Sequence, residues 1–204
     1  MRLIGMLDSP YVRRVAISLQ LQEIAFEHES ISVFSTFDKF AAINPVVKAP
    51  SLVTEDGTVL MDSNLILEYA GRLAKPELRL APDDLKTHAR AQRIIGLALA
   101  ACEKTVQIVY EHHLRPSEKR HQPWLDRVHG QLEAAYRLLE EEMQQADQWI
   151  FGARPLQADI TSAVAVYFTR AMLPDAIDFS THPRLAALST SAEATEAFRT
   201  YPHD

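Results

Sequence analysis

The sequence of 204 residues lacks most features that would assign it to a specialised class of protein. It has one cysteine, which excludes a framework of intramolecular disulfides. It has no apolar run of 18 residues that could form a transmembrane helix. No signal-like apolar segment precedes Asp8, so we expect a cytoplasmic protein. A formal net charge of −6 without a basic region argues against binding to nucleic acid or to a membrane.

What is present is the composition of an ordinary globular protein, long enough for two small domains. We find neither internal repeats nor low-complexity tracts. The clearest interruption is the segment 75–84, which holds two prolines and several charges. We therefore predict a first domain over residues 1–74, a linker over 75–84 and an all-helical domain over 85–204.

The first domain alternates short strands with helices. Three local signals indicate these elements: a proline near the first position of a helix, an Asp-Gly turn between two apolar runs, and a hydroxyl or carboxylate just before an apolar helix. The predicted elements are a strand at 2–6, a helix from Pro10, a strand at 26–33, a hairpin turning at Asp56-Gly57, and a helix over 63–73. This βαβ-ββα order predicts a thioredoxin-like α/β domain.

The second domain shows helical periodicity throughout, which predicts a helical bundle. The predicted apolar stripes are Ala91, Ile94, Ala98, Ala101, Thr105 and Ile108; Leu125, Val128, Leu132, Ala135 and Leu139; and Ile160, Ala163, Val164, Tyr167 and Ala171. A last helical piece is expected from about Pro183 to Arg199. Cys102 lies within the first of these helices, and we interpret it as a small buried apolar residue.

The segment 44–70 is the one that suggests a binding site. Backbone groups beside Pro50 could pair with an extended ligand, and the helix that starts near Asp62-Ser63 offers unpaired N–H groups to a carboxylate. An ordinary hairpin followed by an ordinary helix cap would explain the same residues. Taken alone, this segment therefore leaves both interpretations open.

Together, four motifs resemble the cytosolic glutathione S-transferase superfamily over essentially the whole chain. They are Ser9-Pro10-Tyr11-Val12-Arg13-Arg14, Asn44-Pro45 with Lys48-Ala49-Pro50, Asp62-Ser63, and Gly152 with Ala158-Asp159-Ile160. The resemblance implies a glutathione-binding first domain and a helical second domain that lines the site of an apolar electrophile. It also implies a homodimer, glutathione as co-substrate, no tightly bound cofactor, and a role in detoxification.

The resemblance places Ser9 as the catalytic hydroxyl. A thiol has a pKa of about 8.5, so a donor at a helix N-terminus is needed to favour the thiolate. Ser9 could instead serve only as a helix cap, in which case Tyr11 is the alternative hydroxyl. For glutathione, the resemblance assigns main-chain pairing to Ala49 beside a cis Pro50, and the γ-glutamyl end to Asp62 and Ser63.

The remaining assignments are less specific. Lys48 is placed for the glycyl carboxylate, although a solvated lysine explains it nearly as well. Phe34 or Phe37 would wall the glutathione site, with hydrophobic packing expected for at least one of them. The candidates for the electrophile site are Tyr11, which follows Ser9 closely, and three residues near the end of the first long helix, Tyr110, His113 and Arg115.

Several rival chemistries are disfavoured. The chain has Ser-Pro-Tyr-Val where a glutaredoxin would have Cys-Pro-Tyr-Cys, which excludes dithiol exchange there. The Ser-Ser-Cys-type motif of maleylacetoacetate isomerases is also missing. The histidines, including His112, His121 and His129, lack metal-ligand spacing, so no metal is expected. Two alternatives remain open, a glutathione-dependent peroxidase and a non-catalytic scaffold that binds a protein partner.

One residue departs from the family pattern. Leu156 stands where the family has Ser or Thr three residues before the aspartate of its buried helix. Asp159 can still accept a hydrogen bond from the N–H of Leu156, which would make half of a capping box.

Overall fold

The computed structural model describes residues 1–143 and 148–203. The chain forms two compact units. The first is Met1–Leu80 together with the C-terminal segment from Ala194, and the second is Ala81–Glu193. The predicted fold class, a small α/β domain followed by a helical domain, is confirmed.

A four-stranded sheet forms one layer of the first unit, with strand order β2-β1-β3-β4. The strands are β1 (Arg2–Ile4), β2 (Glu27–Glu29), β3 (Ser51–Val53) and β4 (Val59–Leu60). β1 is parallel to β2 and antiparallel to β3, and β3 pairs with β4 across the predicted hairpin. The strand predicted at 26–33 is much shorter than expected, because it lies at the sheet edge and carries two glutamates.

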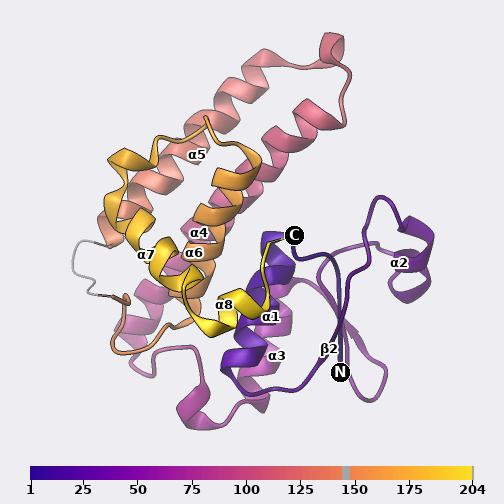
Figure 1. The fold of residues 1–204 in the computed structure, drawn as a ribbon, viewed down its shortest axis with the longest axis vertical. Coiled ribbons are helices and arrows are strands. Elements are labelled where there is room, and N and C mark those ends of the chain that lie inside the picture. Colours follow the sequence, from indigo (N-terminus) through magenta and orange to yellow (C-terminus); the bar gives the residue numbers. More distant parts are fainter. Residues whose placement is uncertain (144–147, 204) are drawn as a thin grey trace. The chain divides into compact units, whose positions relative to one another are not determined.

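The helices of this unit are α1 (Pro10–Leu21), α2 (Phe37–Ile43), α3 (Ser63–Leu73), the 3-10 turn η1 (Pro76–Leu78) and α8 (Glu196–Thr200). α1 and α3 pack against each other, as Figure 1 shows. Apolar side chains of both helices and of the central strands form the core, including Leu3, Val15, Leu52 and Ile66. The sheet therefore has its apolar contacts with this helix pair, while α2 contributes the buried Phe40.

The C-terminal segment belongs to the first unit, whereas the sequence had placed all of residues 85–204 in the helical domain. Arg13 Nε donates to the carbonyl oxygen of Tyr201 at 2.8 Å, and Nη2 donates to that of Phe198 at 3.4 Å. The rings of Phe26 and Tyr201 stack with centroids 5.6 Å apart. The two hydrogen bonds join residues 185 and 188 positions apart in the sequence, so no local pattern predicted them.

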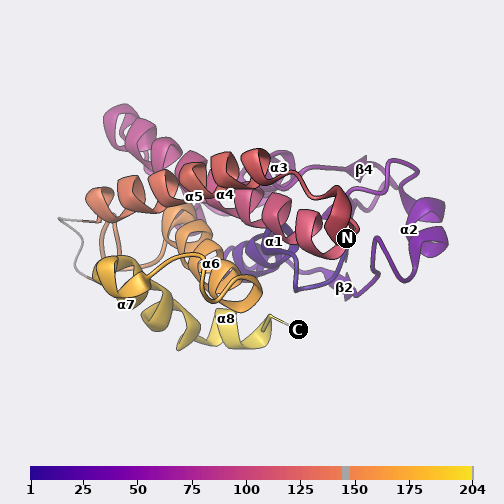
Figure 2. The same ribbon diagram turned by 90° about the horizontal axis from the view of Figure 1, so that it is seen from above.

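The second unit is a helical bundle. Its elements are α4 (Leu85–His113), η2 (Ser117–Lys119), α5 (Gln122–Glu142), α6 (Gln157–Met172), η3 (Phe179–Thr181) and α7 (Pro183–Glu193). Figures 1 and 2 both show α4 and α5 side by side, and α4 also packs on α6. The apolar stripes predicted on α4 and α5 are buried. The third stripe is only partly correct, because Tyr167 and Ala171 are exposed near the end of α6.

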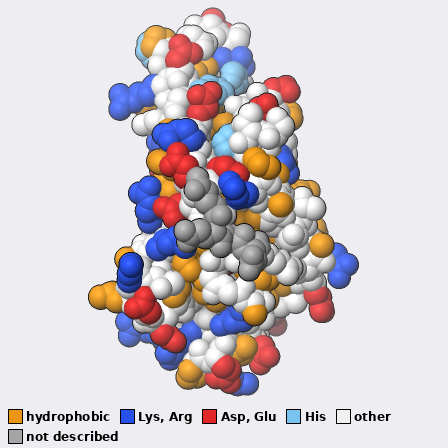
Figure 3. Space-filling model, turned by 90° about the vertical axis from the view of Figure 1, so that its left-hand side faces the viewer, with side chains coloured by type: hydrophobic (Ala, Val, Ile, Leu, Met, Phe, Trp, Pro, Cys, Tyr) orange, Lys and Arg blue, Asp and Glu red, His pale blue; other side chains and the backbone are white. Residues whose placement is uncertain are grey.

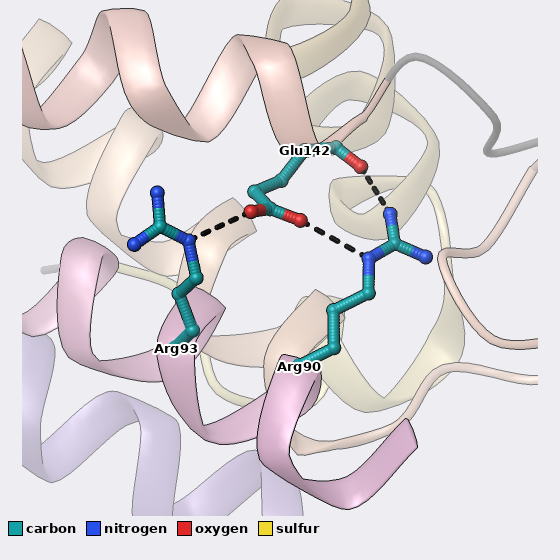
Figure 4. A network of polar contacts seen from close by, with 3 residues as sticks. All are labelled: Arg90, Arg93 and Glu142. Atoms are coloured by element: carbon teal, nitrogen blue, oxygen red, sulfur yellow. Dashed lines mark hydrogen bonds and ion pairs between the residues drawn. The ribbon is translucent and has the colours of Figure 1, made fainter. Parts of the chain in front are cut away.

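Glu142 links the last turn of α5 to the first part of α4 (Figure 4). Its two carboxylate oxygens accept hydrogen bonds from Arg90 Nε at 3.0 Å and Arg93 Nε at 2.8 Å. Arg90 Nη2 also donates to the backbone carbonyl of Glu142 at 2.6 Å, where α5 ends. Burial raises the pKa of Glu142, but the hydrogen bonds from Arg93 and Arg90 outweigh it and hold the pKa below its usual value.

Asp159 caps α6 from inside its first turn. One carboxylate oxygen accepts the N–H of Leu156 at 2.9 Å, as predicted, and the other accepts the N–H of Ile150 at 2.7 Å. Leu156 has no side-chain acceptor, so only the aspartate half of a capping box is present. Burial raises the pKa of Asp159 to about 6, against the lowering effect of both N–H groups.

Membrane-spanning helices and metal-binding groups were sought among the described residues. Across residues 1–143 and 148–203, no helix has the length and apolar character needed to cross a bilayer. Figure 3 shows acidic and basic side chains interspersed on the visible face, with several histidines gathered near one end. Within the same described residues, no group of three or more histidine, cysteine, aspartate or glutamate side chains could hold a metal ion.

Candidate functional site

The turn from β1 into α1 positions Ser9. Ser9 is the N-cap of α1, and its Oγ accepts a hydrogen bond from the backbone N–H of Val12 at 3.4 Å. Pro10 follows at the first helical position, where its fixed φ and missing N–H cost nothing. A hydroxyl has two lone pairs and one proton, so capping uses a lone pair and keeps the proton available. Capping and donation to a thiolate are therefore compatible at Ser9.

Gly5 brings the Ala49–Pro50 segment close to this turn. A β-carbon placed on Gly5 would lie 2.6 Å from Cγ2 of Val12 and 3.3 Å from Cβ of Ala49. Only a glycine allows such an approach, and its φ of +139° also favours glycine. The Ala49–Pro50 peptide bond is cis, as the resemblance implied.

Two buried polar residues hold the backbone around Lys48. Asn44 Nδ2 donates to Ser51 Oγ at 2.8 Å, and Ser51 Oγ donates to the carbonyl oxygen of Lys48 at 2.7 Å. Among the hydrogen bonds of the described residues, none uses the backbone N–H or C=O of Ala49. These main-chain groups could therefore pair with an extended ligand, in the manner of an added strand. The Lys48 side chain is exposed.

The N-terminus of α3 forms the third part of the site. Asp62 is its N-cap and accepts the N–H of Asn64 at 3.0 Å, while Ser63 is the first helical residue. Ser63 is buried and Asp62 is half-buried. A carboxylate accepts at several lone pairs, so the capping bond does not occupy Asp62 fully. Together, a carboxylate, a hydroxyl and helix N–H groups can hold both charges of an amino acid.

Arg14 connects α1 to the N-terminus of α3. The sequence motif that runs from Ser9 to Arg14 includes this residue, but the sequence predicted no role for it. Its Nη1 donates to Ser63 Oγ and to Asn64 Oδ1, each at 3.0 Å. Sequence reasoning also gave no role to Asn44. From the sequence, an arginine next to the apolar stripe of a helix is expected at the surface. Its place in the motif was the one sequence signal that pointed to a role for Arg14.

Three further predicted residues, Phe34, Phe37 and Tyr11, belong to the first unit. Phe34 is 58% exposed in the link before α2, and its N–H donates locally to Ser32 Oγ at 3.1 Å. Phe37, the first residue of α2, is 52% exposed, so neither ring is buried in the core. Tyr11 lies half-buried in the first turn of α1.

Tyr110, His113 and Arg115 belong to the second unit, at or just beyond the end of α4. Tyr110 and His113 are exposed. Arg115 Nε donates to Glu111 at 2.8 Å, and the same carboxylate accepts the N–H of His121 at 3.1 Å. The hydrogen bond from His121, followed by that from Arg115, holds the pKa of Glu111 below its usual value. Arg115 therefore has a structural contact that shapes the connection between α4 and α5.

Comparison with known proteins gives a consistent result. Residues 3–77 match the family model for the glutathione S-transferase N-terminal domain, and residues 122–190 match that for the C-terminal domain. The chain is 30% identical over 140 residues to YibF, an uncharacterised glutathione S-transferase-like protein of Escherichia coli K12. That alignment covers 69% of this chain and 68% of YibF.

Solved structures agree with these matches. A glutathione S-transferase of Methylobacterium radiotolerans, in complex with glutathione sulfonate, has a TM-score of 0.90 and 27% identity, covering 98% of this chain and 93% of its own. A family member from Pseudomonas fluorescens Pf-5, with bound S-(propanoic acid)-glutathione, has a TM-score of 0.81 and 28% identity, covering 98% of both chains. The ordered motifs, the two-unit fold and these similarities show that the chain belongs to the glutathione S-transferase family.

Proposed function

We propose that this chain is an active glutathione transferase in which Ser9 stabilises the glutathione thiolate for attack on an electrophilic small molecule. The observation that carries the proposal is the position of Ser9. It caps α1 through a lone pair, so its proton remains available at a helix N-terminus that Gly5 brings close to Ala49.

In this proposal, glutathione binds in an extended form across the first unit. The backbone of Ala49 pairs with the cysteinyl residue. Asp62 takes the γ-glutamyl ammonium, and Ser63 with the N–H groups of α3 takes the γ-glutamyl carboxylate. Lys48, on the same segment as Ala49, is available for the glycyl carboxylate. Support comes from the unused backbone groups of Ala49 among the described residues and from the polar N-terminus of α3.

The chemistry then follows from the thiol. Only a few per cent of a thiol with a pKa of about 8.5 is ionised at neutral pH. A hydrogen bond from Ser9 and the partial positive charge of the helix N-terminus both favour the thiolate. The thiol proton passes to solvent, the sulfur lone pair forms a bond to the electrophilic carbon, and the leaving group departs with its electron pair. Tyr11, Tyr110, His113 and Arg115 stay candidates for contacts with an apolar electrophile.

The test is to titrate the thiol of bound glutathione by its thiolate absorbance in the wild-type protein and in Ser9→Ala. Loss of one preorganised donor typically lowers the turnover rate by about 10²–10³-fold, less if water can reach the sulfur. We expect a higher thiol pKa, slower conjugation and nearly unchanged glutathione affinity in Ser9→Ala. Ser9→Thr is the matched control, because it keeps both the capping oxygen and the proton.

Each outcome decides between the alternatives. Identical titration in the wild type and Ser9→Ala would reduce Ser9 to a helix cap and transfer its role to Tyr11 or a backbone N–H. A wild-type protein that does not bind glutathione would favour the scaffold alternative. Glutathione binding with turnover of peroxides, but of no carbon electrophile in a panel, would favour the peroxidase alternative.

A further inference from the structure

The side chain of Arg14 is buried, with 2% of its surface exposed, although it carries a charge at any working pH. Burial of a charged group is costly unless its hydrogen bonds are made. The Nη1 of Arg14 donates to Ser63 Oγ and Asn64 Oδ1, the side chains of the first two residues of α3. An arginine in the middle of α1 therefore fixes side chains at the start of another helix, 49 residues further along the chain.

The direction of these hydrogen bonds matters for what Ser63 can do. Since a guanidinium only donates, Ser63 Oγ must act as the acceptor in this bond, which leaves its own proton for donation to a different group. Asn64 is held in the same way, because its amide oxygen faces Arg14 and its NH₂ group is directed elsewhere. A hydrogen bond from a cationic donor also polarises the hydroxyl and makes it a better donor in turn. Both residues are thereby prepared to donate to an anion.

We infer that Arg14 is a positioning residue, which orients Ser63 and Asn64 toward the γ-glutamyl carboxylate of glutathione without touching that carboxylate itself. This inference rests on the proposed function, since it names what organises one part of the proposed glutathione site. It goes beyond that proposal in giving a specific task to a buried cation on α1. It also predicts that Arg14 discriminates between ligands that have the γ-glutamyl carboxylate and ligands that lack it.

Arg13 provides a matched control. It is the next residue on α1 and equally buried, at 1% exposed, but it donates to backbone carbonyls of the C-terminal segment. Replacing either arginine by methionine removes a buried guanidinium from the same helix. Both variants should lose stability, because each loses a buried guanidinium. A difference between them in ligand binding therefore reflects the different groups to which Arg13 and Arg14 donate.

The experiment measures dissociation constants by calorimetry for two ligands, glutathione and an analogue in which 4-aminobutyrate replaces the γ-glutamyl group, so that the carboxylate is absent. For glutathione, we expect Arg14→Met to raise the dissociation constant by roughly 10- to 100-fold, the range for a charge-assisted hydrogen bond. Arg14→Lys should recover part of this loss, because the charge is kept. Arg13→Met should bind glutathione as the wild type does. The analogue should bind the wild type weakly, and Arg14→Met should leave that binding nearly unchanged.

The outcomes separate this inference from the proposed function. If the wild type does not bind glutathione, the proposed function itself fails. If the wild type binds glutathione and folded Arg14→Met binds it equally well, only the positioning role is overturned. The positioning role is also overturned if Arg14→Met weakens both ligands by the same factor, or if Arg13→Met weakens glutathione as much as Arg14→Met does. If neither methionine variant folds, Arg14→Lys and Arg13→Lys give the same comparison.

Discussion

Gly5 illustrates how one residue controls the geometry of the site. It lies between β1 and the turn that ends at Ser9, with a φ of +139° that an L side chain rarely adopts. Its missing side chain leaves room for Val12, whose backbone N–H is the capping donor to Ser9. The position of the proposed catalytic hydroxyl therefore depends on a residue that makes no contact with a ligand in the proposal.

We expect Gly5→Ala to destabilise the protein more than Gly152→Ala. Gly152 has almost the same φ, +135°, but no atom of the described residues outside its chain neighbours lies within 4 Å of an added β-carbon. Gly152→Ala should cost only the conformational penalty, about 1–3 kcal/mol. Gly5→Ala adds an overlap with Val12, worth about 1–3 kcal/mol more. Urea denaturation followed by circular dichroism measures both losses, and equal losses would show that Val12 moves aside freely.

At the scale of secondary-structure elements, the N-termini of helices carry most of the proposed chemistry. Ser9 caps α1 and Asp62 caps α3, and both caps have further hydrogen-bonding capacity. In the helical unit, Asp159 lies in the first turn of α6 and is purely structural, because it is fully buried and both of its carboxylate oxygens accept backbone N–H groups. The difference lies in the number of bonds that each polar group has already made within the fold.

Glu142 gives a test at the level of packed helices, because it links α4 to α5 (Figure 4). We expect Glu142→Gln to lower the free energy of unfolding by about 1 kcal/mol at pH 7, a value reduced by the partial exposure of both arginines. Glu141→Gln is the control. It removes a carboxylate from an exposed pair with Arg137, which should contribute about 0.3–0.5 kcal/mol or less.

The effect of Glu142 should also depend on pH. Its pKa is lower in the folded state than in the unfolded state, so the unfolded state binds more protons as the solution is acidified. Its contribution to stability is therefore present above the unfolded pKa and is lost as the pH falls through the folded pKa. The difference between the wild type and Glu142→Gln should shrink below about pH 4.5 in urea denaturation. A difference that stays constant down to acid pH would contradict this linkage.

At the scale of the whole molecule, we propose a homodimer, which the family resemblance implies. The first unit leaves large apolar side chains exposed, including Phe34 at 58%, Val46 at 64% and Leu65 at 57%. Association would remove such surface from water. Sedimentation at micromolar concentration should therefore give a species of twice the chain mass of 23.0 kDa. A species with the mass of one chain would contradict the proposal.

The sequence by itself determined the features that depend on neighbouring residues. The Asp-Gly turn at Asp56, the caps at Ser9 and Asp62, and the apolar stripes of α4 and α5 follow from interactions within a few positions. These local signals, in their order along the chain, were sufficient to predict the α/β unit and the helical unit. The same segments contain the motifs that resemble the glutathione S-transferase family, and the candidate site residues were predicted from that resemblance.

Only the tertiary structure decided which distant groups meet. The bonds from Arg14 to the start of α3 and from Arg13 to the C-terminal segment join residues 49 to 188 positions apart. The short length of β2 and the exposure of Phe34, Phe37 and Tyr167 likewise depend on what packs against each residue. Periodicity and capping signals report the energetics of one segment, whereas the partner of a buried charge is set by the packing of several segments.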